Sequence, residues 1–121
     1  MKKTLKNKIT LRPRGRKVDF DVLGKLETIL DTSSYRRDHL IEYLHKIQDS
    51  QGAITKNYMT ALANLMGISQ TEVYEVATFY HHFDVVDTDS DKPPSLTVRI
   101  CDSVTCEMNG ANELAKTLDD Y

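Results

Sequence analysis

Residues 96–101, with the sequence LTVRIC, form the one stretch of this chain that we interpret as a half-buried β-strand. Leu96, Val98 and Ile100 fall on one face, and the residues between them fall on the other. The stretches before it repeat their apolar residues with the period of an amphipathic helix. Because one strand cannot form a sheet, the chain should fold as several helices followed by the beginning of a second unit. We therefore predict an α+β protein.

Four helices are predicted ahead of this strand, within residues 19–31, 35–52, 55–67 and 69–83. Gly52 and Gly67 are typical helix ends, and Thr55 is a typical N-cap. Ser69 and Glu72 have the spacing of a capping box, in which each side chain accepts a hydrogen bond from the other residue's backbone N–H. We expect a four-helix bundle over residues 18–86. Its predicted inward side chains are Val22, Leu26, Ile29, Leu30, Leu40, Leu44, Ile47, Tyr58, Leu62, Leu65, Met66, Val73, Val76, Ala77 and Tyr80.

The composition changes over residues 87–95, where acidic residues precede Pro93 and Pro94. This pattern predicts a linker or an exposed turn. Residues 96–121 then contain the single strand, a loop that carries Cys106, and a last helix that begins after Gly110. One strand and one helix make an incomplete domain.

Charge is unevenly distributed along the chain. Residues 1–17 contain eight Lys or Arg and no acidic residue, whereas the rest holds eight bases and all eighteen acids and so has a net charge of −10. The first segment is interpreted as a basic flexible tail. Contact with an acidic partner and an organelle-targeting leader are the alternatives. No apolar run approaches the ~20 residues of a membrane-spanning helix, so we expect no direct membrane insertion.

Both cysteines, Cys101 and Cys106, lie in one short stretch with four residues between them. The N-terminus lacks the apolar core of a secretory signal, which indicates a reducing, cytoplasmic compartment and disfavours a disulfide. The spacing alone leaves two alternatives open, a pair of buried thiols and half of a metal site. A zinc site would need further ligands, and no histidine lies nearby in the sequence.

Neither a catalytic site nor a DNA-binding site is predicted. No nucleophile–base pair or phosphate-binding loop is evident, and His81 and His82 point about 100° apart on a helix, so they cannot easily share a metal. Residues 61–80 resemble a helix-turn-helix in outline. However, the second helix carries Glu72 and Glu75 and no Lys or Arg, which is unfavourable beside phosphates.

Two segments together resemble a known family. The stretch EVYEVATFYHHFDV, followed by LTVRICDSVTCEMNGANEL, is similar to the thioredoxin-like [2Fe–2S] subunit of NADH-oxidising modules. That family includes the 24 kDa-type subunit of respiratory complex I, the γ subunit of NAD-dependent formate dehydrogenases, and diaphorase subunits of NAD-linked hydrogenases. The resemblance covers residues 18–121. The two segments together are much more specific for this family than either segment alone.

The resemblance implies a helical N-terminal domain followed by a thioredoxin-like ferredoxin domain. Family members hold their cluster with C-x₄-C and a later C-x₃-C, so Cys101 and Cys106 match the first pair, and the second pair has no match up to Tyr121. The implied function is electron transfer between this [2Fe–2S] cluster and the FMN of a flavoprotein partner that oxidises NADH. The implied location is the cytoplasm, or the cytoplasm- or matrix-facing arm of a membrane complex.

Four side chains near the end of the fourth helix are expected to contact the flavoprotein: Phe79, Tyr80, His82 and Phe83. A place in the internal core is the alternative for Phe79 and Tyr80. The chain as a whole has two alternative functions. One is a docking module without a cluster, and the other, less favoured, is a DNA-binding protein. A homodimer, in which two chains pair through the uncovered strand, is a further expectation.

Overall fold

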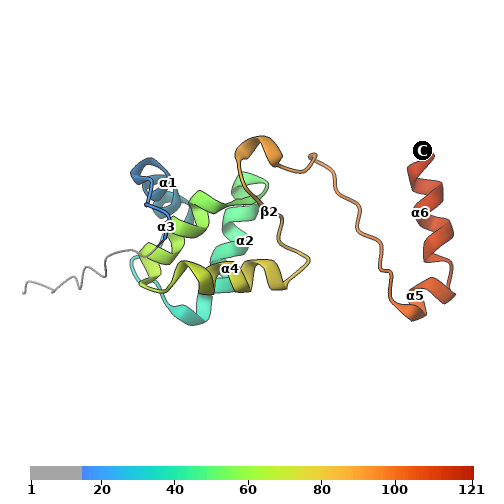
Figure 1. Ribbon diagram of the computed structural model, residues 1–121, viewed down its shortest axis with the longest axis horizontal. Helices are drawn as coiled ribbons and strands as arrows, with labels where there is room; N and C mark the ends of the chain where they lie inside the picture. The colour runs from blue at the N-terminus through green and yellow to red at the C-terminus, as the bar shows by residue number, and fades with distance from the viewer. Residues whose placement is uncertain (1–14) are drawn as a thin grey trace, which may run out of the picture.

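The computed structural model describes residues 15–121 and shows a mixed fold that consists mainly of helices (Figure 1). The predicted flexible tail falls mostly on residues 1–14, which lie outside the described residues. The four main helices are α1 (Phe20–Leu30), α2 (Leu40–Gln51), α3 (Lys56–Met66) and α4 (Gln70–Phe79). The shorter elements are η1 (Arg37–His39), β1 (Ile54–Thr55), β2 (Val85–Val86), η2 (Asp89–Asp91), α5 (Val104–Met108) and α6 (Ala111–Asp119).

The starts of α3 and α4 follow the predicted capping signals. The Thr55 side chain accepts a hydrogen bond from the Tyr58 N–H at 3.4 Å, and Ser69 accepts one from the Glu72 N–H at 3.2 Å. The predicted capping box is only half formed, because the Glu72 carboxylate pairs with Arg37. Gly67 ends α3 in the left-handed conformation, with φ of 67°, which a glycine adopts without strain.

The fourth helix is shorter than predicted. It ends at Phe79, because Tyr80 is extended, with φ of −94° and ψ of 124°. The chain then turns, and the Phe83 N–H donates to the Tyr80 carbonyl at 3.2 Å. This turn places Phe83 in the hydrophobic core, with 7% of its surface exposed.

One hydrophobic core lies among the four helices. Helix α1 packs on α2 and α3, and α4 packs on α2 and α3, so each helix contacts two others. Most of the predicted inward side chains are confirmed as buried. The exceptions are Tyr80, which is exposed, and five side chains that pack at the margin of the core: Val22, Ile29, Leu65, Met66 and Val76. The fully buried large side chains are Leu26, Leu30, Leu44, Ile47, Ile54, Leu62 and Val73. The bundle geometry itself remains a prediction.

A two-stranded parallel sheet joins distant parts of the helical region. Ile54 is paired with Val85, and Thr55 with Val86. Parallel strands need a long crossover, and α3 and α4 provide it. The sheet extends by one further bond, in which the Ile54 N–H donates to the Asp84 carbonyl at 2.8 Å.

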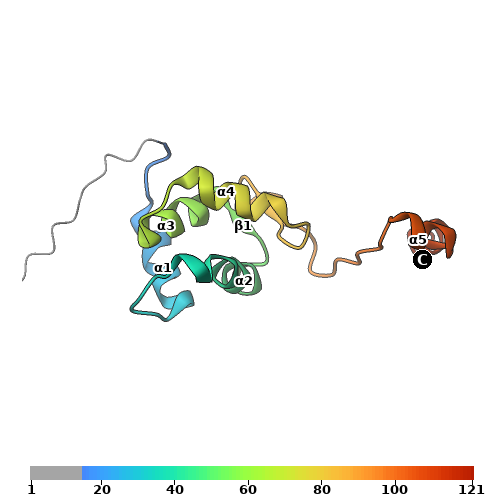
Figure 2. The same cartoon turned by 90° about the horizontal axis from the view of Figure 1, so that it is seen from below.

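The predicted strand at residues 96–101 is not formed. These residues are extended, but among the described residues they have no partner strand, and a strand requires one. Leu96, at 78% exposed, and Val98 therefore lie on the surface. In both views, α5 and α6 lie away from the four main helices at the end of this extended segment (Figure 1, Figure 2). No helix among the described residues is long and apolar enough to cross a membrane.

Candidate functional site

The two cysteines lie at the junction between the extended segment and α5. Cys101 ends the extended segment and is exposed, Ser103 is the residue before α5, and Cys106 lies within α5 and is half-buried. Both thiols are free. The metal-ligand role that the resemblance implies for these two residues stays a prediction.

Hydrogen bonds around Cys101 favour its thiolate. Its Sγ lies 3.2 Å from Ser103 Oγ. Hydrogen bonding by the Ser103 side chain and backbone, and then by the Cys106 side chain, lowers the pKa of the Cys101 thiol below its ordinary value. A lower pKa matters here because the thiolate, rather than the thiol, is the metal ligand.

This donor set fits half of an iron–sulfur cluster. Two adjacent thiols, one of them with a lowered pKa, have the chemistry of iron ligands, and a [2Fe–2S] cluster with cysteine ligands needs four. Within residues 15–121 no three His, Cys, Asp or Glu side chains come together as a metal site. Cys101 and Cys106 could therefore supply at most two of the four ligands that such a cluster needs.

The predicted partner-binding residues divide into two groups. Phe79 is 74% exposed, Tyr80 is 42% exposed, and His82 is also exposed. Phe83 is different, because it is buried in the core and its ring contacts that of His45, with a centroid distance of 4.9 Å. Phe83 is therefore corrected from a surface residue to a core residue. The rings of Phe79 and Tyr80 lie edge to face, with a centroid distance of 4.9 Å.

A shallow pocket of about 290 Å³ lies beside these aromatic residues, between the start of α2 and the outer face of α4. Phe79 and Tyr80 form one wall, and the ion pair of Arg37 with Glu72 closes another side. No sequence pattern indicates this ion pair, because the two residues lie far apart along the chain and the spacing of Glu72 is typical of a residue that caps its own helix.

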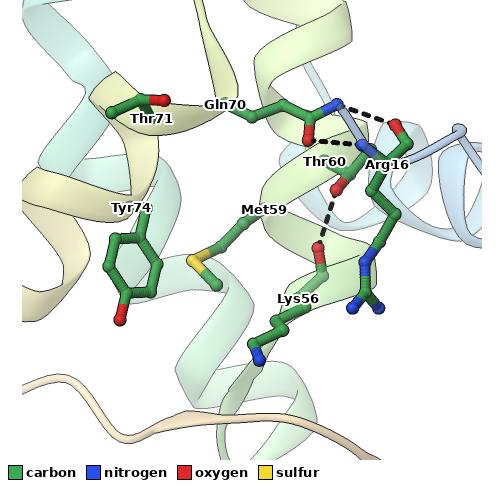
Figure 3. A pocket seen from close by; sticks show the side chains of 7 residues that line it. All are labelled: Arg16, Lys56, Met59, Thr60, Gln70, Thr71 and Tyr74. Atoms are coloured by element: carbon green, nitrogen blue, oxygen red, sulfur yellow. Dashed lines mark hydrogen bonds between the residues drawn. The ribbon is translucent and has the colours of Figure 1, made fainter. Parts of the chain in front are cut away.

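A second pocket, of about 250 Å³, lies between the starts of α3 and α4 (Figure 3). The Gln70 side chain fixes the backbone of Arg16 here. It accepts from the Arg16 N–H at 3.1 Å and donates to the Arg16 carbonyl at 2.8 Å. Gly15 adopts φ of +133°, and an added Cβ would lie 2.8 Å from Gln70 Oε1. These two hydrogen bonds anchor the segment that leads into α1. Lys56, which also lines the pocket, forms an ion pair with Asp87.

A set of polar contacts near the end of α4 was not predicted from the sequence. Gln48 of α2 donates to the His82 carbonyl at 2.8 Å and accepts from the Asp84 N–H at 2.6 Å. The rings of His45 and His82 lie against each other, with a centroid distance of 4.7 Å. Arg99 reaches the Asp84 carboxylate from the extended segment. Only the tertiary fold brings these residues together.

Comparisons with known proteins identify a family that covers most of the chain. A family model described as thioredoxin-like [2Fe-2S] ferredoxin matches residues 26–121. The chain is 31% identical to the E subunit of the NADH-quinone oxidoreductase of Buchnera aphidicola, over 85% of this chain and 58% of that protein. It is 28% identical to the corresponding protein of Aquifex aeolicus, over 78% of this chain and 56% of that protein.

A third relative is the alpha subunit of the NAD-reducing hydrogenase HoxS of Cupriavidus necator, which is 28% identical over 79% of this chain and 15% of that protein. The chain thus spans little more than half the length of the two NADH-quinone oxidoreductase relatives. The family match covers most of the chain, and the chain belongs to the thioredoxin-like [2Fe–2S] ferredoxin family.

Proposed function

We propose that this chain serves in an electron-transfer subunit of an NADH-oxidising complex, with Cys101 and Cys106 as two of the four thiolate ligands of a [2Fe–2S] cluster. The observation that carries the proposal is the pair of neighbouring free thiols, one with a lowered pKa, in a chain of this family. When bound, such a cluster supplies one-electron exchange. The proposal covers three kinds of complex: respiratory complex I, NAD-dependent formate dehydrogenase and NAD-linked hydrogenase.

The roles of the protein's own residues follow from the local geometry. In this proposal Cys101 and Cys106 each supply one sulfur ligand, and Ser103 stabilises negative charge on Cys101 through its hydroxyl and its N–H. Because Cys101 is exposed, a second pair of ligands can approach it from outside the described residues. Hydrogen bonds to the sulfur atoms also tune the potential of iron–sulfur centres, so Ser103 would contribute to tuning.

The proposed partner is a flavoprotein subunit that binds FMN and NADH. The proposed contact surface consists of Phe79, Tyr80 and His82. An exposed aromatic pair, here Phe79 and Tyr80, is typical of the anchors in protein–protein interfaces. The names of the relatives, which include NADH-quinone oxidoreductase and NAD-reducing hydrogenase, support NADH-linked chemistry. The proposed location is the cytoplasm, or the cytoplasm- or matrix-facing arm of such a complex.

The ligand role is tested by anaerobic reconstitution, with measurement of iron, acid-labile sulfide, the visible spectrum and the oligomeric mass. We expect bound iron in the unmodified chain and its loss in Cys101→Ser and Cys106→Ser. Met108→Ser is the matched control, because it removes another sulfur atom from α5 at an 83% exposed position. Two irons per two chains would identify a homodimer with one shared site. Equal iron in the unmodified chain and in the cysteine variants contradicts the ligand role, and absence of iron in every chain favours a docking module without a cluster.

A docking module without a cluster is the second candidate function, favoured by the exposed Phe79 and Tyr80 beside a shallow pocket. It predicts that Phe79→Ala weakens binding to an isolated flavoprotein subunit, whereas Cys101→Ser does not. An interface anchor of this kind is worth more than about 1 kcal/mol, or roughly fivefold in Kd. Phe20→Ala is the control, because Phe20 is an 81% exposed phenylalanine on α1. Equal effects of the two substitutions contradict a specific docking role.

A further inference from the structure

One side chain makes the polar contacts that join the extended segment carrying Cys101 to the helical region. Arg99 lies two residues before Cys101, and its Nη2 lies 3.0 Å from both carboxylate oxygens of Asp84. The same nitrogen lies 3.5 Å from the His82 carbonyl oxygen. Among the described residues, no other hydrogen bond or ion pair joins residues 93–121 to the rest.

Arg99 binds the His82 carbonyl and the Asp84 carboxylate, and both residues belong to a turn that other contacts hold in place. Gln48 bonds both the His82 carbonyl and the Asp84 N–H, so one amide side chain of α2 fixes the backbone on either side of Phe83. The Asp84 carbonyl accepts from the Ile54 N–H, and β2 begins at the next residue. The buried Phe83 ring anchors the same turn in the core. Arg99 therefore binds to a rigid part of the helical region.

The segment between this turn and Arg99 has few other restraints. Residues 93–103 form no helix or strand, and the ion pair of Lys92 with Asp89 is local to the linker. Both Figure 1 and Figure 2 show α5 and α6 at the end of this extended stretch, away from the four main helices. Loss of Arg99 would remove the hydrogen bonds and the ion pair that join the cysteine-bearing part to the helices among the described residues.

We propose that Arg99 is a positioning residue, which ties the cysteine-bearing segment to Asp84 and sets where Cys101 and Cys106 lie relative to the surface of Phe79, Tyr80 and His82. The functional meaning of this tie rests on the proposed function, because it fixes the distance from the cluster ligands to the docking surface. The tie itself is a property of the chain without iron. It is electrostatic, since Asp84 and Arg99 are partly exposed and face each other as opposite charges.

The test measures the distance between two spin labels by pulsed electron paramagnetic resonance in the full chain. Cys101→Ser and Cys106→Ser remove the native thiols, and Asp49→Cys on α2 and Asp102→Cys beside residue 101 provide two exposed labelling positions. With Arg99 and Asp84 intact, we expect one dominant, narrow distance. Arg99→Ala and Asp84→Asn should each lower the ratio of tied to detached chains by about fivefold, which corresponds to about 1 kcal/mol for a partly exposed ion pair.

Two comparisons separate positioning from general stability. The reversed pair, Arg99→Asp with Asp84→Arg, should restore the narrow distance, and Lys92→Ala should leave it unchanged, because it removes an ion pair that lies within the linker. In 1 M salt the unmodified pair should give a broad distribution like that of Arg99→Ala, since the screening length falls to about 3 Å. Thermal unfolding of the four main helices should stay the same in all variants.

An unchanged distance in Arg99→Ala and in high salt would overturn the proposal. A broad distribution already present in the unmodified pair at low salt would overturn it as well. Neither result would bear on the ligand role, because these chains contain no cysteine ligands. Conversely, absence of iron in the reconstitution experiment would leave the tie itself intact and remove its functional meaning.

Discussion

Gln48→Ala provides the sharpest test of how the helical region is held together at the end of α4. The Gln48 side chain donates to the His82 carbonyl at 2.8 Å and accepts from the Asp84 N–H at 2.6 Å. It spans from α2 to a turn that is 34 and 36 residues away in the chain. Alanine removes both bonds but keeps the helix, because it is the best helix former.

The expected loss follows from these two bonds. Each bond contributes a net of about 1 kcal/mol to stability. Because Asp84 is half-buried, water only partly replaces the Gln48 oxygen as the acceptor for the Asp84 N–H. The higher helix propensity of alanine returns a few tenths of a kcal/mol. We therefore expect Gln48→Ala to lower the free energy of unfolding by about 1.5–2 kcal/mol. The β1–β2 pairing should weaken with it, because β2 starts immediately after Asp84.

Urea denaturation followed by circular dichroism measures this loss as a lower midpoint with an unchanged slope. Gln51→Ala is the matched control. It makes the same substitution on the same helix and removes only a local bond to Ser50 at 2.9 Å, so it should cost less than about 0.5 kcal/mol. Equal midpoints for the two variants would refute the inference that Gln48 holds the turn.

Three further outcomes are expected. Leu44→Ala, at a fully buried core position, should cost about 2–5 kcal/mol in urea denaturation. Thr55→Ala should lose about 1 kcal/mol by removing the N-cap of α3, and Thr55→Ser should retain most of it, as thermal melts would show. Ser103→Ala should raise the pKa of the Cys101 thiol toward its ordinary value. The thiolate fraction at neutral pH then falls, and alkylation of Cys101, followed by peptide mass spectrometry, should slow and need higher pH.

The starts of α3 and α4 and the ends of α2 and α3 were predictable because their signals are local, whereas α2 begins at Leu40, later than predicted, and has no side-chain cap. Thr55, Ser69 and Gly67 cap helices where the sequence places them, and each acts on residues within one turn. The end of α4 was placed too late, at Phe83. The sequence between Phe79 and Phe83 contains no glycine or proline that would mark an end. The helix stops there because the core accepts the Phe83 ring, and that preference is tertiary.

The candidate site divides in the same way. The cysteine pair could be found from the sequence, since four intervening residues and one short helix bring both thiols together. The long-range contacts that hold the surrounding structure could not be predicted from the sequence. Gln48 with Asp84, Arg37 with Glu72, and the β1–β2 pairing all join residues that are distant in the chain. Strands of two residues are also too short to show any periodicity.

The missing partner of residues 96–101 leads to a final prediction. Leu96 and Val98 are exposed on a segment whose backbone groups lack a neighbouring strand among the described residues, and Cys101 at its end is exposed as well. In the chain without iron, we expect residues 95–121 to exchange their amide hydrogens quickly, while α1–α4 stay protected. Strong protection of residues 96–101 in a chain shown to be monomeric would contradict this.

A segment or second chain that supplied the neighbouring strand would cover the apolar side chains and satisfy the backbone at the same time. If that strand also brought the remaining thiolates, iron loading and sheet completion would be one event. Hydrogen exchange at residues 96–101 should then slow in proportion to the iron bound during reconstitution. Iron loading without any change in exchange at residues 96–101 would show that the ligands arrive on a surface that leaves this edge uncovered, and would separate the two events.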